Sequence, residues 1–234
     1  MKNFTSLVKE SFKIYSEKKT IWPVLLICLI GVLAISSLYS FLGNVEENVE
    51  LTQLVLWSFL FFGITIIVCI ASVFLTLILI VLIIKSPEAQ LKDILRESWL
   101  KLGQGLGVFI LTMLFGVLGI LLFIIPGIVI GIFLCFSLYI CVIENKKGMD
   151  ALKGSWNLVK GNWWNVFWRV FLLNIIFSAI YFLFVAISVY GILPLVFQSL
   201  FIPFNIIYMY LVYLDLKKIA ENKTQSESVI SANE

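Results

Sequence analysis

The sequence predicts an all-α fold: a polytopic membrane helical bundle of six transmembrane helices with amphipathic helices on its cytoplasmic surface. The first observation is composition, since 61% of the 234 residues are hydrophobic and the mean hydropathy is +1.06. Soluble domains are about 45 to 50% apolar. The second is that charged residues, 13% of the chain, lie in short stretches between long uncharged runs. The third is the one-sided distribution of Lys and Arg.

The first two hydrophobic runs each predict one span. The basic segment before the first run is too long for a signal peptide, and the run itself is long enough to cross the bilayer. The second run has no charge over 51–84. As one helix it would be about 51 Å long, against a hydrocarbon core of about 30 Å. It must therefore tilt, bend near Gly63 or project beyond the membrane.

Two further hairpins complete the bundle. The uncharged run 106–143 is divided by Pro126-Gly127, which predicts two spans joined by a tight external turn. Tyr190-Gly191 divides the last run in the same way. The predicted spans are 21–43, 51–84, 106–125, 128–143, 163–189 and 193–214. The polar tail 219–234 is predicted to be disordered and cytoplasmic.

An amphipathic segment precedes each pair of spans. One lies at the N-terminus, the second follows the start signal Ser86-Pro87-Glu88, and the third covers 149–160. Each carries an apolar stripe at helical spacing with charges on the other faces, so it should lie along the membrane surface. Gly103-x-Gly105-x-Gly107 predicts a hinge between the second such helix and the third span.

The basic residues set the orientation. Five of the 17 Lys and Arg precede Thr20, four lie within 85–101, five within 146–169 and three after Leu214, which leaves none for the external turns. Cytoplasmic loops of membrane proteins carry this excess. The sequence therefore predicts a multi-pass protein of the cell membrane with both termini in the cytoplasm.

The three amphipathic segments contain a similar short motif. The copies are Lys9-Glu10-Ser11-Phe12, Arg96-Glu97-Ser98-Trp99 and Lys153-Gly154-Ser155-Trp156. They predict a threefold repeat of one surface helix followed by one hairpin. The alternative is that surface helices resemble one another and that such short matches arise by chance.

The sequence offers no catalytic, cofactor or metal constellation. It has no histidine, and its four cysteines lie singly inside apolar runs. No acidic or basic residue falls in the middle of a span, where ion-coupled transporters usually need one. Nothing in it resembles a nucleic-acid module. We therefore expect a protein that is not an enzyme and that needs no cofactor.

Two groups of residues are candidate contact sites. Asn174, Gln198 and Asn205 are polar side chains within the fifth and sixth spans, and Asn174 and Asn205 are expected at similar depth near the midplane. The alternative is a structural hydrogen bond between helices, worth about 0.6 to 2 kcal/mol. The second group is aromatic and lies near the cytoplasmic face. It consists of Trp99, Trp156, Trp163 and Trp164.

Some residues carry a resemblance to a known family. They are 123–128 with Pro126-Gly127, then Ser137, then 148–169 with Lys160-Gly161-Asn162-Trp163-Trp164. This pattern resembles a bacterial family of six-span proteins: the membrane domain attached to some glycerophosphodiester phosphodiesterases and its stand-alone relatives of unknown function. The chain lacks a soluble catalytic domain, so the resemblance implies the membrane fold and no phosphodiesterase activity.

Two functions follow as hypotheses. The first is a non-enzymatic scaffold or accessory subunit, whose partners would be the lipid bilayer and another membrane protein. The second is a transporter or handler of lipids or small molecules that acts without ion coupling. The surface helices favour the first, and the polar midplane residues favour the second.

Overall fold

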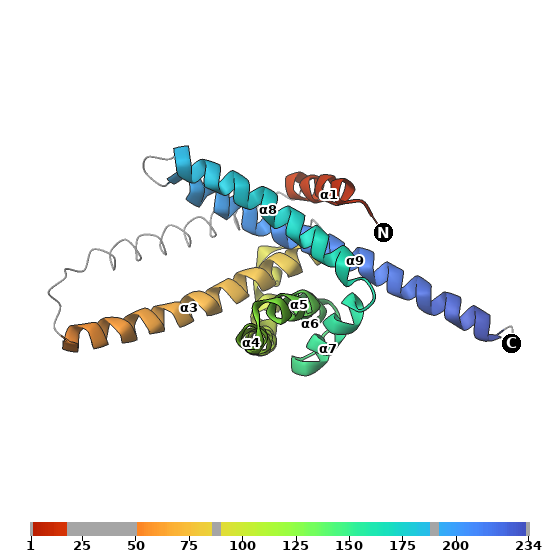
Figure 1. Ribbon diagram of the computed structural model, residues 1–234, viewed down its shortest axis with the longest axis horizontal. Coiled ribbons are helices and arrows are strands. Elements are labelled where there is room, and N and C mark those ends of the chain that lie inside the picture. Colours follow the sequence, from red (N-terminus) through yellow and green to blue (C-terminus); the bar gives the residue numbers. More distant parts are fainter. Residues whose placement is uncertain (1, 18–50, 86–89, 188–191, 233–234) are drawn as a thin grey trace.

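A computed structural model describes residues 2–17, 51–85, 90–187 and 192–232. Every regular element within these ranges is an α-helix (Figure 1). The helices are α1 (Phe4–Glu17), α3 (Leu51–Ile84), α4 (Leu91–Leu122), α5 (Ile124–Leu134), α6 (Ser137–Ile143), α7 (Gly148–Val159), α8 (Trp163–Ile187) and α9 (Ile192–Ala232). The predicted first span 21–43 lies outside the described residues, as do Ser86-Pro87-Glu88 and Tyr190-Gly191.

Five segments of the described chain are long and apolar enough to cross a membrane. These are Phe62–Ile84, Leu91–Leu122, Ile124–Ile143, Trp163–Ile187 and Leu193–Lys223. The coarse prediction of a helical membrane protein is confirmed to this extent. α3 is one continuous helix through Gly63, so the excess length of the second predicted span is not relieved by a break there.

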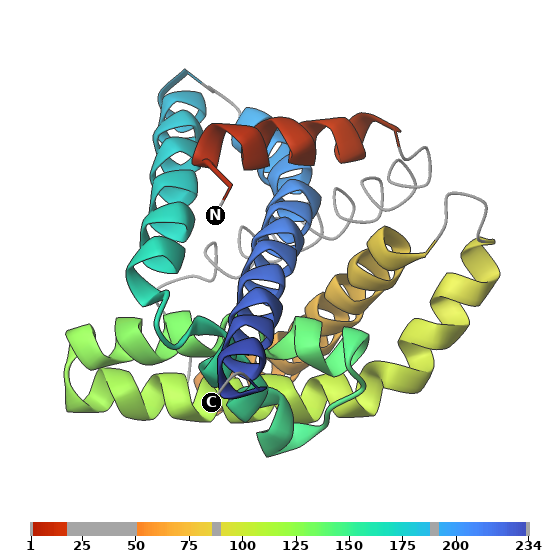
Figure 2. The same ribbon diagram turned by 90° about the vertical axis from the view of Figure 1, so that its right-hand side faces the viewer.

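The glycines Gly103, Gly105 and Gly107 do not divide the chain into two helices. The second amphipathic segment and the third span form the single helix α4, which changes direction along its length without a break (Figure 2). Glycine lowers helix propensity by about 1 kcal/mol but still donates and accepts the helical hydrogen bonds. Gly105 is there for packing, because an added Cβ would lie 3.0 Å from Leu77 Cδ1 on α3.

The turn of the α4–α5 hairpin lies earlier than predicted. The extended residue Phe123 ends α4, and α5 begins at Ile124. Pro126 thus falls in the first turn of α5, where its missing N–H leaves no bond unmade. Gly127 is buried against the crossing helix, since a Cβ on it would lie 2.6 Å from Ile120 Cγ1. Gly131, one helical turn later, has open space around it and takes no part in this contact.

The disorder predicted for the tail 219–234 stays a prediction, although the described part of the tail is helical. α9 continues to Ala232 as a helix, through most of the segment 219–234 that the sequence marks as disordered. That stretch contains neither Pro nor Gly, and extending an existing helix avoids the unfavourable nucleation step. The amino-acid composition of the segment alone does not predict this extension, because it contains no information about the helix that precedes it.

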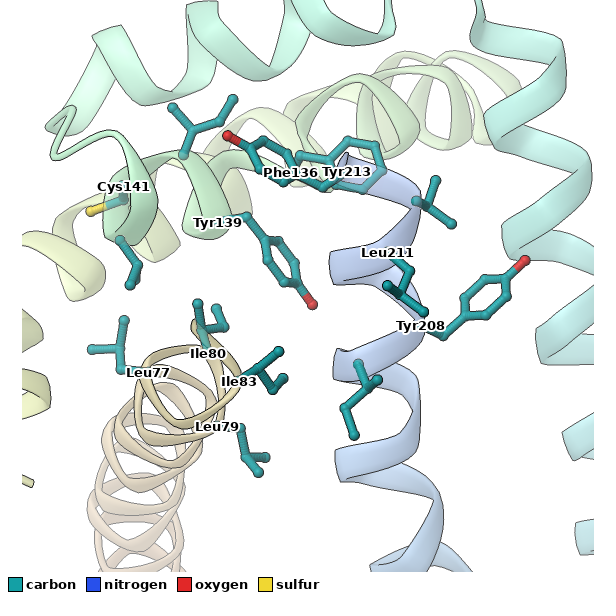
Figure 3. Packing of buried hydrophobic residues seen from close by; sticks show 14 of the residues in the cluster. Leu77, Leu79, Ile80, Ile83, Phe136, Tyr139, Cys141, Tyr208, Leu211 and Tyr213 are labelled. Atoms are coloured by element: carbon teal, nitrogen blue, oxygen red, sulfur yellow. The ribbon is translucent and has the colours of Figure 1, made fainter. Parts of the chain in front are cut away.

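The core lies between three inner helices. α3, the α5–α6 pair and α9 supply most of the buried apolar residues, whereas α4 and α8 lie outside them. Figure 3 shows Tyr139 of α6 between Ile80 of α3 and Leu211 of α9. The Tyr139 hydroxyl donates to the carbonyl oxygen of Ile206 at 3.0 Å, and its ring stacks on Tyr213. The Tyr139 hydroxyl bond therefore adds a directional contact to the apolar packing of the inner helices.

Candidate functional site

A groove between α8 and α9 contains two of the three predicted midplane residues. It has a volume of about 390 Å³. Its lining is Asn174, Phe177, Ser178, Tyr181, Phe197, Gln198 and Phe201. Asn205 does not line it, because it lies two helical turns, about 10 Å, beyond Gln198 along α9. The geometry brings Asn174 and Gln198 to one groove and leaves Asn205 outside.

The walls of this groove are mainly aromatic. Phe177 stacks on Phe201 with ring centroids 4.0 Å apart and on Phe197 at 5.7 Å. The Asn174 amide donates to the carbonyl oxygen of Val170 within its own helix, at 2.8 Å. Its amide oxygen, the Gln198 side chain and the hydroxyl groups of Ser178 and Tyr181 are the polar groups that a ligand could meet. Such a groove suits a molecule with an apolar body and an uncharged hydrogen-bonding group.

The predicted surface tryptophans differ in their packing. Trp99 meets Phe74 of α3 edge to face at 5.7 Å and remains 67% exposed. Trp156 stacks flat on Phe133 of α5 at 4.0 Å. Trp163 and Trp164 begin α8, where Trp163 stacks on Phe167 and Trp164 is 65% exposed. Each of the four keeps part of its ring at the surface.

The three copies of the sequence motif share one pattern of burial. Ser11, Ser98 and Ser155 are all fully buried. The residues four positions earlier are buried too; they are Leu7, Ile94 and Ala151. The aromatic residue after each serine is exposed and meets a phenylalanine on an inner helix. The pairs are Phe12 with Phe204, Trp99 with Phe74 and Trp156 with Phe133.

Those three phenylalanines lie at the same distance in sequence from a charged residue near the end of each inner helix. Phe74, Phe133 and Phe204 are each followed, eleven residues later, by a charged residue. Each of these charges forms an ion pair with another element. The pairs are Lys85 with Glu97 at 2.8 Å, Glu144 with Lys217 at 3.1 Å and Asp215 with Arg169 at 2.9 Å. The sequence reasoning missed this spacing, although a search for aromatic residues at constant distance from the ends of alternate spans could have found it.

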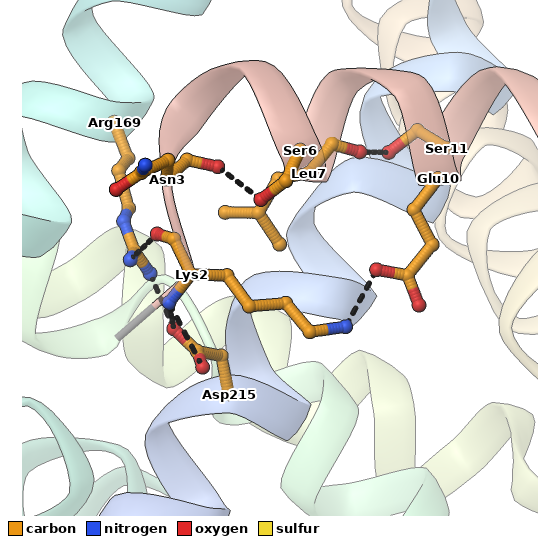
Figure 4. Close-up of polar contacts among 8 residues, drawn as sticks. All are labelled: Lys2, Asn3, Ser6, Leu7, Glu10, Ser11, Arg169 and Asp215. Atoms are coloured by element: carbon orange, nitrogen blue, oxygen red, sulfur yellow. Dashed lines mark hydrogen bonds and ion pairs between the residues drawn. The ribbon is translucent and has the colours of Figure 1, made fainter.

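The Arg169–Asp215 pair is the most buried charge cluster of the described residues. The two side chains are each 9% exposed, and they join α8 to α9 (Figure 4). The N-terminal segment completes the cluster. The Lys2 backbone N–H donates to Asp215 Oδ2 at 3.1 Å, and Arg169 donates to the Lys2 carbonyl oxygen. Buried charges need such partners, because an isolated one would cost several kcal/mol.

Glu144 holds the end of α6 to α9. Tyr213 donates its hydroxyl to Glu144 Oε1 at 2.9 Å, and Lys217 approaches the same oxygen at 3.1 Å. Lys146 contacts Oε2 at 2.8 Å. Partial burial raises the pKa of Glu144, but the bonds from Lys146, Tyr213 and Lys217 outweigh it and lower the pKa from 4.5 to about 2. The carboxylate is therefore ionised and works as a structural anchor.

The described residues contain no group of three or more His, Cys, Asp or Glu side chains placed to hold a metal ion. Comparison of the chain with protein-family models, with curated proteins and with solved structures found no match to any of them. The argument for function therefore rests on the geometry above.

Proposed function

We propose that this chain is a non-enzymatic integral membrane protein that serves as a scaffold or accessory subunit. In this proposal it has six spans in the cell membrane, with both termini in the cytoplasm. The observation that carries the proposal is an exposed aromatic ridge on α8, formed by Trp164, Phe167, Trp168 and Phe171. Trp164 is 65% and Trp168 is 51% exposed. Within the ridge, Phe167 stacks on Phe171 at 5.2 Å.

An exposed aromatic surface favours a protein partner. Aromatic residues are enriched in the buried centre of protein interfaces, because they offer large area with few rotatable bonds to immobilise. Tryptophan is also enriched where a helix passes through the lipid headgroups. These two explanations predict different neighbours for the ridge in a native membrane, so they can be separated by experiment.

The threefold repeat belongs to the same proposal. We infer a unit in which an amphipathic helix is docked on the inner helix of the preceding hairpin through its buried serine and its aromatic residue. α7 docks on α5–α6, the start of α4 docks on α3, and α1 docks on α9. The last contact joins the first unit to the third and would close a ring. A closed ring of packed units supports the scaffold role.

Photo-crosslinking in native membranes tests the scaffold role. A photoreactive phenylalanine analogue replaces Trp164 or Phe171 on the ridge, and replaces Leu118 or Leu121 on α4 as controls. The controls are also exposed apolar residues. We expect one discrete protein adduct from the ridge positions and lipid adducts alone from α4. Lipid adducts alone at all four positions would contradict a partner on the ridge.

A handler of lipids or small molecules, without ion coupling, is the second candidate. The groove that holds Asn174 and Gln198 favours it, because those amides lie in a mainly aromatic wall. Liposomes containing this protein alone would be assayed for movement of fluorescent lipids. This function predicts that N174L with Q198L abolishes movement and that N205L, outside the groove, does not. Absence of movement with the unaltered protein would reject it.

A further inference from the structure

A second groove lies where α4, α5 and α7 meet. Its volume is about 250 Å³, and its lining is Phe115, Ile130, Leu134, Met149, Leu152, Lys153 and Trp156. Six of these seven side chains are apolar. Trp156 forms a flat wall, because it is stacked on Phe133 at 4.0 Å. The groove is thus an apolar slot beneath an amphipathic helix, with one ammonium group beside it.

Lys153 is available to a ligand. It is exposed, and no ion pair or hydrogen bond engages its side chain among the described residues. By contrast, nearby Lys146 is bound to Glu144. Asp150 lies one turn before Lys153 on α7, but the two do not form an ion pair. Residues 147–160 carry three lysines against that one acid, so the local charge is positive.

We propose that this groove binds one acyl chain of an anionic phospholipid whose phosphate contacts the Lys153 ammonium. The apolar slot provides the surface for the chain, and the lysine beside it provides the charge that selects the headgroup. Trp156 suits the boundary between the two, since an indole ring combines a large apolar face with one N–H donor. The inference is independent of the scaffold role and of the α8–α9 groove.

The sequence repeat places a cation at the same position in every copy. Lys9 and Arg96 stand two residues before Ser11 and Ser98, as Lys153 stands before Ser155. Both are exposed. Among the described grooves, however, the one at Lys153 combines that cation with an apolar slot. The lipid site is therefore assigned to α7 alone.

Native mass spectrometry of the full chain, delipidated in detergent, tests the site. The probes are phosphatidylglycerol and phosphatidylcholine with identical acyl chains. We expect tighter binding of phosphatidylglycerol to the unaltered protein, and we expect K153Q to weaken it about fivefold. The matched control is K160Q, because Lys160 is an exposed cation just after α7 that does not line the groove. Equal binding of the two lipids, or equal effects of K153Q and K160Q, would overturn the proposal.

A second pair of variants tests the slot itself. M149W places a large ring in the groove and should reduce retention of phosphatidylglycerol, whereas L118W adds the same ring on an exposed face of α4 outside it. A photoreactive residue at Met149, activated in native membranes, identifies the occupant. A lipid adduct supports the site, and a protein adduct would show that a partner chain fills the groove instead.

Discussion

Arg169 and Asp215 form a buried ion pair that joins α8 to α9 and holds the N-terminal segment before α1. Each side chain is 9% exposed, and the backbone of Lys2 supplies further hydrogen bonds to both. Taking two charges out of water has a large desolvation cost, so such a pair is weakly stabilising when complete but harmful when broken. Its importance lies in the connection that it makes between α8, α9 and the N-terminal segment.

Breaking this pair should destabilise the protein strongly. R169A leaves the Asp215 carboxylate buried without its partner, and we expect the free energy of unfolding in detergent to fall by about 3 to 5 kcal/mol. The double variant R169M with D215L should recover most of that loss, because no charge then remains buried. Circular dichroism during denaturation measures both.

The control for this test is a surface pair. Lys2 and Glu10 are joined at 2.6 Å, but their side chains are 42% and 41% exposed. Exposed pairs contribute about 0 to 1 kcal/mol, so E10A should change stability little. The structural account of the buried pair would be untenable if R169A and E10A had equal effects.

Glu144 predicts a pH dependence with a definite sign. Its pKa is lowered from 4.5 to about 2, so the folded state favours the carboxylate more than the unfolded state does. This stabilisation is fully present above pH 4.5 and is lost as the pH falls toward 2. We expect Tm in detergent to fall over this window by a larger amount in the unaltered protein than in E144Q. Parallel curves for the two proteins would contradict this role of Glu144.

At the scale of the element, Ser155 forms hydrogen bonds across the break between two helices. The apolar segment Ile124–Ile143 is interrupted at Cys135 and Phe136, between α5 and α6. The Ser155 hydroxyl accepts a bond from the Phe136 N–H at 3.2 Å and donates to the Phe133 carbonyl oxygen at 2.7 Å. A side chain on α7 thus replaces a bond that the interrupted backbone does not make.

S155A and S98A form a matched pair, since both serines are fully buried. Ser98 donates to the Ile94 carbonyl oxygen within its own helix, and that carbonyl belongs to the helical ladder. S155A should cost about 1 to 3 kcal/mol, because it leaves the buried Phe136 N–H without a partner. S98A should cost less than about 1 kcal/mol. Denaturant titration measures the loss in free energy of unfolding. An equal loss for S98A and S155A would refute this role of Ser155.

The α4–α5 crossing gives a second contrast within one element pair. A Cβ on Gly119 would lie 2.9 Å from the Gly127 Cα, which is backbone and cannot turn aside. A Cβ on Gly131 would meet nothing within 4 Å. G119A should therefore destabilise the protein by about 1 to 3 kcal/mol, whereas G131A should stabilise it by about 0.5 to 1 kcal/mol. Thermal unfolding of the two variants measures the difference, and a shared sign would exclude this explanation.

At the scale of the whole molecule, the six-span arrangement has a direct test. Reporters that are active on only one side of the membrane are fused after Glu47, Gly127 and Gly191. The absence of Lys and Arg from these external turns predicts that all three reporters lie outside the cytoplasm. Any one of them found inside would reduce the number of spans or reverse part of the chain.

The predictive power of the sequence differed between parts of the chain. Long uncharged runs identified the helices that are apolar enough to cross a membrane, because that property is additive along the chain. The continuation of α4 through Gly103 and of α9 beyond Ile219 could not be predicted from composition, because helix continuation depends on the neighbouring turns. The fixed distance from Phe74, Phe133 and Phe204 to the following charges was present in the sequence but was not found.

The sequence by itself determined an all-helical, strongly apolar chain, the polar residues Asn174 and Gln198, and the three serine motifs. Only the tertiary structure decided that Asn174 and Gln198 share a groove without Asn205, that Arg169 pairs with Asp215, and that Ser155 completes the break before α6. The physical reason is the distance along the sequence over which each kind of interaction acts. Hydrophobicity and helix periodicity act over a few turns of one segment, whereas these contacts join residues 19 to 46 positions apart and depend on how the helices pack.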